Sequence, residues 1–175
     1  MYANEELLYY LLPLNTNQAV IEQLYACFSR KDYQGMSACY HPDAEFSDGV
    51  LAVKGKQIAA MWHLLCESAN DLSVECYLWN ADGVQGSADW EATYTFSPTG
   101  RKVHNLFHAR FDFSEGKIIR HRENFHFWRW AGMALGTTGL LLGWTPFIRN
   151  QVRKTAVANL REFADKHPQY TALFT

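Results

Sequence analysis

Apolar and polar residues alternate along the segment from Leu72 to Trp130, which is the pattern of β-strands with one buried face. One run places four apolar side chains on the same face, at Trp90, Ala92, Tyr94 and Phe96. The next run repeats the pattern at Phe107, Ala109, Phe111 and Phe113. Residues typical of tight turns separate the runs, at Asp82-Gly83, Pro98-Thr99-Gly100 and Glu115-Gly116. We predict four successive long strands in a curved antiparallel sheet with one aromatic face.

Three other stretches have the spacing of amphipathic helices. They run from Asn15 or Thr16 to about Lys31, from Gly55 onward, and from Pro146 to about Lys166. Between the first two we predict a helical turn over 36–40, a short strand over 44–47 that ends at Asp48-Gly49, and a second strand over 50–54. Residues 1–15 are acidic and lack a basic region before their apolar run, so we expect a helix or arm rather than a signal peptide.

Residues 131–148 carry no charge and contain four glycines and Pro146. The length reaches the lower limit for a membrane span, but the glycines and the proline interrupt it. We expect a helical hairpin that is buried or used as an oligomer contact, and no membrane span. The predicted organisation is an arm over 1–15, a domain over 16–130, and a helical extension of that domain over 131–175.

The composition and the motifs of the chain argue against several classes of function. The net charge is −2 and the pI is near 6.4, which gives no electrostatic case for nucleic acid or an anionic membrane. The four cysteines have no CxxC spacing, so we expect free thiols and a cytoplasmic protein. Nucleotide-binding, serine-hydrolase and HExxH motifs do not occur, and we expect no cofactor. Aromatic residues make up 15% of the chain, which fits a lined cavity, an oligomer interface or a well-packed core.

The order of these elements resembles the cone-shaped NTF2-like α+β fold. Residues 41–49 (HPDAEFSDG) resemble the turn that enters the cone in SnoaL-like and ketosteroid-isomerase-like members. Residues 90–96 with Gly100-Arg101 resemble their central hairpin, and 116–123 resemble their last strand. The resemblance covers about Thr16 to Trp130, while residues 140–146 look like an extension found in a bacterial subgroup. It implies a curved mixed or antiparallel sheet packed against N-terminal helices. It leaves the activity open, because members include isomerases, cyclases, epoxide hydrolases, dehydratases and binders that are not enzymes.

Asp48 matches the catalytic aspartate of the ketosteroid isomerases, so the resemblance implies a general base there. The alternative is a turn former, because Asp before Gly commonly binds its own backbone. Leu24 and Ala109 stand where the oxyanion donors of that enzyme would be, and Tyr25 lies about 100° around the helix from Leu24. We therefore do not expect the mechanism of ketosteroid isomerase.

His121 and Glu123 are two residues apart on the last predicted strand and share a face with Phe125 and Phe127. The pair is either an acid–base pair in a pocket or a buried hydrogen bond that fixes the core. We expect the pocket walls and a ligand-orienting amide at Trp62, Trp90, Tyr94, Phe107, Phe125 and Asn105, with core packing as the alternative. The spacing does not favour a metal bound by Asp48, His121 and Glu123, and we expect none. His63 and His126 have no obvious partner and are expected on the surface or at a dimer face.

Two functions remain. The first is binding of a small, largely apolar organic molecule, with cofactor-independent isomerase, cyclase, dehydratase or hydrolase chemistry by Asp48, His121 and Glu123. The second is a non-catalytic ligand-binding or homodimerisation module. Its interface would be the sheet face, at Tyr77, Trp79, His108, Arg110 and Arg122.

Overall fold

The alternating segment folds as four antiparallel strands in a computed structural model that describes residues 16–68, 70–171, 173 and 174. The strands are β3 (Ser73–Ala81), β4 (Gln85–Phe96), β5 (Arg101–Ser114) and β6 (Lys117–Phe125). The turns form where the sequence predicts them. Gly100 and Gly116 have φ angles of 67° and 70°, a conformation that glycine adopts without steric cost. The predicted meander is confirmed.

Two further strands complete a mixed sheet of order β2-β1-β6-β5-β4-β3. Strand β1 (Tyr40–Ser47) runs parallel to β6, and β2 (Ala52–Lys54) runs antiparallel to β1. The predicted strand over 44–47 is too short, because β1 begins at Tyr40 and bypasses Pro42 through a register shift between Tyr40 and Glu45. The predicted helical turn lies earlier, as α3 (Tyr33–Ala38), where the Asp32 side chain accepts a hydrogen bond from the Gly35 N–H.

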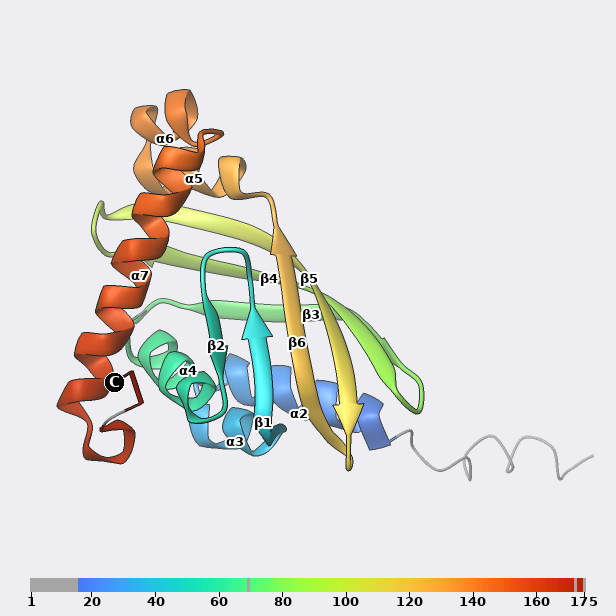
Figure 1. The fold of residues 1–175 in the computed structure, drawn as a ribbon. Helices are drawn as coiled ribbons and strands as arrows, with labels where there is room; N and C mark the ends of the chain where they lie inside the picture. Colours follow the sequence, from blue (N-terminus) through green and yellow to red (C-terminus); the bar gives the residue numbers. More distant parts are fainter. Residues whose placement is uncertain (1–15, 69, 172, 175) are drawn as a thin grey trace, which may run out of the picture.

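Helices α2 (Thr16–Ser29) and α4 (Lys56–Ser68) lie inside the curve of the sheet (Figure 1). Aromatic rings from the helices and the strands fill the space between them. The Trp90 ring of β4 lies 5.6 Å from the Phe28 ring of α2 and stacks on Phe107 of β5 at 4.0 Å. This contact fixes α2 against the strands, as the predicted aromatic face requires.

The chain turns helical directly after β6. Phe127 was predicted on the same strand face as Phe125, but it begins α5 (Phe127–Leu135), where the His126 Nδ1 accepts a hydrogen bond from the Arg129 N–H. Helix α6 (Thr137–Leu142) folds back on α5, and a Cβ at Gly139 would lie 1.8 Å from the Ala131 carbonyl oxygen. Only glycine permits that approach. The predicted helical hairpin is present, but its outer side is exposed rather than buried.

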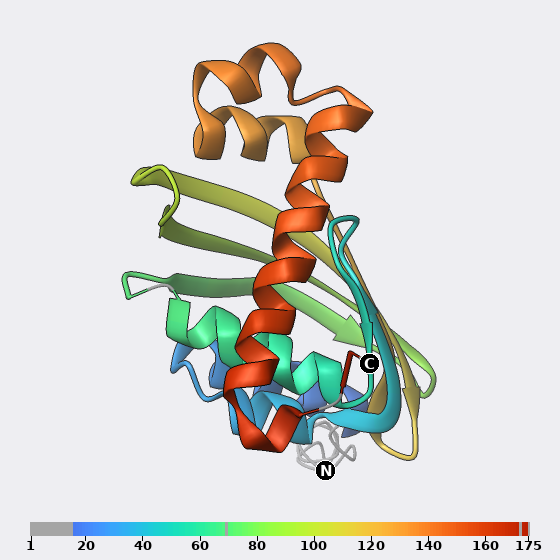
Figure 2. The same cartoon turned by 60° about the vertical axis from the view of Figure 1, so that its left-hand side comes forward.

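Helix α7 (Pro146–Lys166) begins at Pro146, as predicted, and runs from this hairpin to α4, followed by a short 3-10 helix over Pro168–Tyr170 (Figure 2). Within the described part of the chain, none of the helices has the length and apolar character needed to cross a membrane. The predicted arm over 1–15 lies outside the described residues.

Candidate functional site

His121 and Glu123 both lie on the inner face of β6, enclosed between the sheet and the helices. His121 is 0% exposed and Glu123 is 6% exposed. Their neighbours on β5 are Phe111 beside His121 and Ala109 beside Glu123. The two side chains are therefore held in a dry interior, where unpaired polar atoms are costly.

A chain of hydrogen bonds orients the His121 ring. Trp62 Nε1 of α4 donates to the Tyr40 hydroxyl of β1 at 3.2 Å, and that hydroxyl lies 2.7 Å from His121 Nδ1. The indole only donates, so the tyrosine oxygen accepts there and its own proton is available to Nδ1. That arrangement leaves the proton of a neutral imidazole on Nε2. The His121 ring is thus held in place by Tyr40 of β1 and, through the Tyr40 hydroxyl, by Trp62 of α4.

His121 Nε2 and Glu123 Oε1 are 3.1 Å apart, but the N–H does not point at the oxygen. Neither atom has a hydrogen-bond partner among the described residues. The His121 ring is surrounded by aromatic rings, with centroid distances of 4.4 Å to Phe111 and 5.0 Å to Phe46. Aromatic rings therefore enclose His121, and the polar atom beside its Nε2 is Glu123 Oε1, at ion-pair distance but without hydrogen-bond geometry.

Tyr25 belongs to the same interior, although its position about 100° around the helix from Leu24 led us to expect no donor role for it. It follows Ile21 by four residues and precedes Phe28 by three, a spacing that places it on the buried stripe of α2. Its ring lies 5.6 Å from Trp90, and its hydroxyl is buried without a partner in the described ranges. Burial, followed by the negative charge of Glu123, raises the pKa of Tyr25 well above its ordinary value. Tyr25 is therefore a neutral hydroxyl donor.

Asp48 lies in the turn between β1 and β2. Its Oδ1 accepts hydrogen bonds from the N–H groups of Val50 and Leu51, at 2.8 and 2.7 Å, which is the turn-forming role. Burial raises the pKa of Asp48, the two backbone N–H bonds oppose that shift, and the charge of Glu123 raises the pKa further. The charge of Glu123 therefore acts on Asp48.

The residues expected as walls lie along the inner face. Trp62, Trp90 and Asn105 are buried, and Tyr94, Phe107 and Phe125 are half-buried. The ring of Phe107 lies 5.5 Å from that of Phe125. Trp130 of α5 donates from Nε1 to the Tyr94 hydroxyl at 2.9 Å. The C-terminal extension therefore contacts the wall of the cone at Tyr94.

Two open hollows of about 550 and 520 Å³ lie elsewhere on the surface. Asp48, His121 and Glu123 line neither of them. Arg122 contributes to both, and its guanidinium is already paired with Asp112 at 2.6 Å. Because the three candidate residues lie away from these hollows, we place the candidate chemistry on the inner face.

The proposed dimer face is polar. His108 pairs with Asp89 at 2.6 Å on this outer side of the sheet, and Arg110 and Tyr77 are exposed there. Trp79 does not belong to this face, because it packs toward α2 and donates from Nε1 to Glu22. A homodimer through the sheet stays a prediction.

The free cysteines are poor nucleophiles. Burial raises the pKa of Cys39 to about 12 and that of Cys66 to about 11. Both thiols remain protonated at neutral pH, so thiolate chemistry has no support there.

One histidine expected on the surface is buried instead. His63 of α4 is 5% exposed and lies 2.8 Å from the Glu67 carboxylate, whereas His126 is exposed and caps α5. With His167, this pair brings together three potential metal ligands at a distance from the inner face of the sheet.

Comparison with solved structures agrees with this architecture. The LEH-like epoxide hydrolase of M. tuberculosis superposes with a TM-score of 0.59 at 16% identity, covering 73% of this chain and 96% of that one. A putative polyketide cyclase from Xanthomonas campestris gives a TM-score of 0.58 at 16% identity, covering 68% and 96%. TsrD from Streptomyces laurentii gives 0.61 at 16% identity, covering 71% and 98%. At these identities the likeness establishes the fold.

Sequence comparison identifies the family. No curated protein matches the chain. The model of the SnoaL-like domain matches residues 21–121, which is more than half of the chain and includes most of α2 together with β1, α4 and the strands up to His121. The chain therefore belongs to the SnoaL-like domain family, with an NTF2-like α+β fold.

Proposed function

We propose that this chain binds a small, largely apolar organic molecule that carries an oxygen atom, on the inner face of the sheet, and performs cofactor-independent acid–base chemistry on it. One observation carries the proposal. Four buried polar atoms between α2 and the inner face make no hydrogen bond within the described part of the chain: Tyr25 OH and Trp90 Nε1, and His121 Nε2 and Glu123 Oε1, which lie 3.1 Å from each other as an ion pair. Leaving a buried polar group unpaired costs about 1–3 kcal/mol, so such groups gather where a ligand or water pairs with them.

Hydrogen-bond donation to the ligand and proton transfer are assigned to different residues. Tyr25 and Trp90 offer an O–H and an N–H to a ligand oxygen, and Glu123 is the carboxylate that accepts or returns a proton. His121 is a positioning residue for Glu123. Asp48 is the second carboxyl group, and the charge of Glu123 contributes to the raised pKa of Asp48.

Small side chains adjoin Glu123 on the sheet. Ala109 is its direct neighbour on β5, and Ala88 is the neighbour of Ala109 on β4. Bulky residues at these positions would fill the inner face beside the carboxylate. The alanines therefore support binding next to Glu123, while the aromatic walls favour an apolar ligand.

The reaction class follows from the available groups. A carboxyl pair with a neutral phenol supports isomerisation, cyclisation, dehydration or hydration, each of which needs a proton moved to or from carbon or oxygen. The names of the similar structures, an epoxide hydrolase and a putative polyketide cyclase, agree with this class. A cytoplasmic location remains our expectation from the free thiols.

We expect the protein to bind 2-naphthol, an apolar bicycle with one hydroxyl, in a saturable titration followed by naphthol fluorescence. Glu123→Gln should weaken binding by about 10- to 100-fold, because a hydrogen bond to a charged group contributes about 1.5–3 kcal/mol. Ala109→Phe should abolish binding by filling the space beside Glu123. Leu106→Phe is the matched control, since Leu106 lies on the same strand but is 39% exposed on the outer face. Binding that is unchanged in both Glu123→Gln and Ala109→Phe would contradict the proposed site.

We expect Asp48 and Asp82 to affect the pH dependence of stability in opposite directions. Both carboxyl groups accept hydrogen bonds from two backbone N–H groups in turns. Burial raises the pKa of Asp48 above its ordinary value of 3.8, so ionisation destabilises the fold as pH rises through the raised pKa. The backbone N–H bonds lower the pKa of exposed Asp82, so its ionisation stabilises the fold, and that contribution is lost as pH falls through the lowered pKa.

Urea denaturation at pH 3 and pH 7 measures this difference. For each variant we compare its free energy of unfolding with that of the wild type. For Asp48→Asn this difference should shift toward greater stability between pH 3 and pH 7. For Asp82→Asn it should shift toward lower stability between pH 3 and pH 7. Equal pH dependence of the two variants would show that Asp48 is not the desolvated carboxyl group that the proposal requires.

A further inference from the structure

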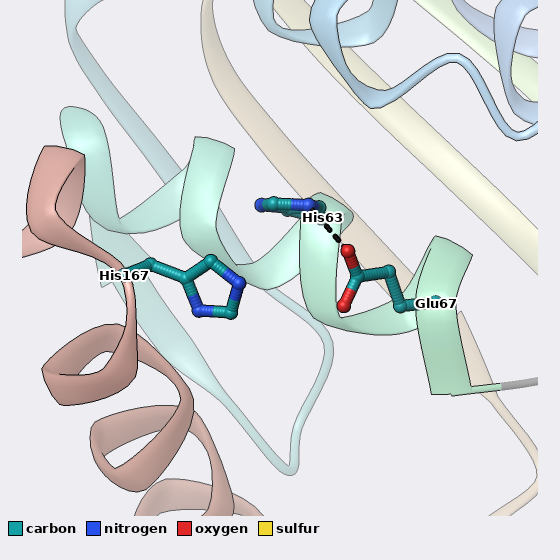
Figure 3. A group of neighbouring side chains, drawn as sticks. All are labelled: His63, Glu67 and His167. Carbon is teal, nitrogen blue, oxygen red and sulfur yellow. Dashed lines mark hydrogen bonds and ion pairs between the residues drawn. The ribbon is translucent and has the colours of Figure 1, made fainter.

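A second group of polar side chains joins the C-terminal extension to α4. His63 and Glu67 are four residues apart on α4, and His167 at the end of α7 faces them (Figure 3). Each of the three residues offers a ligand atom, and these atoms all lie within 4.8 Å of one another. Two imidazoles and one carboxylate form a donor set that suits Zn²⁺.

The hydrogen bonds leave lone pairs available on both rings. His167 Nδ1 lies 2.7 Å from the Phe163 carbonyl oxygen, which only accepts, so the proton is on Nδ1 and the lone pair is on Nε2. A backbone carbonyl commonly orients metal-binding histidines in this way. His63 Nε2 lies 2.8 Å from Glu67 Oε1, an acceptor, so the lone pair of that ring is on Nδ1. This Nδ1 is buried without a hydrogen-bond partner among the described residues, which is a second sign of a missing ligand.

We propose that His63, Glu67 and His167 bind a divalent transition metal, with Zn²⁺ as the best match and water completing a tetrahedral site. The exposed side chain of Glu67 gives the ion access from solvent. The metal would fasten the end of α7 to α4. Without it, the extension is held there by aromatic packing such as that between His63 and Phe163, at 5.0 Å.

Isothermal titration of the EDTA-treated, untagged full chain with ZnCl₂ tests this site. We expect one Zn²⁺ per chain and a higher melting temperature, because an ion that binds only the folded state stabilises it. His167→Ala and Glu67→Gln should each weaken binding at least tenfold. His104→Ala is the matched control, since His104 also faces a carboxylate, Glu91 at 3.1 Å, and it should bind like the wild type.

No binding by the wild type would overturn the proposal, and so would binding that survives both His167→Ala and Glu67→Gln. Glu67 is exposed, so its substitution keeps the test valid if His167→Ala fails to fold.

The helical hairpin carries an independent inference. Its outer side exposes six large apolar side chains, at Trp128, Leu140, Leu141, Leu142, Trp144 and Phe147, and Phe147 is 72% exposed. Figures 1 and 2 show the hairpin standing beyond the ends of the strands. The indole Nε1 atoms of Trp128 and Trp144 donate to the carbonyls of Leu140 and Leu141, so the two rings are held at this surface.

Charge is distributed unevenly around this surface. Residues 124–154 contain four basic residues and no acidic ones, at Arg129, Arg149, Arg153 and Lys154. The chain as a whole has a net charge of −2, so the remainder carries −6. The net charge of the whole chain argues against binding to an anionic membrane. This end of the molecule is basic, so that argument does not apply to it.

We propose that the hairpin binds an anionic membrane surface and lies in its interface without crossing it. Exposed tryptophan and leucine side chains suit the boundary between headgroups and acyl chains, and the arginines suit acidic headgroups. A second copy of the chain fits less well, because a two-fold contact would bring the same basic surfaces together.

Co-sedimentation with vesicles tests this surface. We expect the full chain to pellet with 3:1 phosphatidylcholine–phosphatidylglycerol vesicles at 0.1 M NaCl, and at least tenfold less with phosphatidylcholine alone or in 1 M NaCl. Leu141→Glu should abolish binding. Leu78→Glu is the matched control, because Leu78 is 59% exposed on β3 while Leu141 is 64% exposed on the hairpin. The proposal fails if the wild type does not pellet, if both variants lose binding equally, or if Leu141→Glu instead abolishes lipid-free dimerisation.

Discussion

Packing of aromatic rings between α2, α4 and the concave face of the sheet is the contact on which the other features depend. Trp90 touches both Phe28 and Phe107, so one side chain joins a helix to two strands. Aromatic pairs of this kind contribute about 0.5–1.5 kcal/mol each beyond the area that they bury. The same packing carries Tyr25 and Trp62 inward, and it excludes water from the β6 residues that face the helices.

The polar groups of β6 are unusual because they remain in this dry interior. His121 is oriented by Tyr40 and Trp62, yet within the described chain its Nε2 and the Glu123 oxygen 3.1 Å away make no hydrogen bond. A core selected for stability alone would pair such atoms or replace them with apolar groups. Their arrangement is understandable if a ligand or a water molecule completes it.

Local patterns predicted much of this fold, and contacts between distant segments account for what was missed. The hairpins from Leu72 onward were predictable because alternation and turn residues act over a few positions. The early start of β1 at Tyr40 depends on parallel pairing with β6, which is remote in sequence. Phe127 continues the apolar pattern of β6, but capping by His126 begins a helix there.

In the site, His121 and Glu123 were predicted from their shared strand face. Tyr25 was not expected to act as a donor, because Leu24 occupies the matching position of the helix, although both residues are buried. His63 was misplaced because two of the rings that pack against it, Phe163 and His167, lie about one hundred residues further on, at the end of α7.

A high-resolution crystal structure of the full chain is the most direct test of the inner face as a binding site. Our account predicts ordered water or a small molecule hydrogen-bonded to Glu123 Oε1 and to the Tyr25 hydroxyl. Density in which these side chains pair with each other, with no room for a further molecule between the sheet and α2, would contradict it. The inner face would then be a core and not a site.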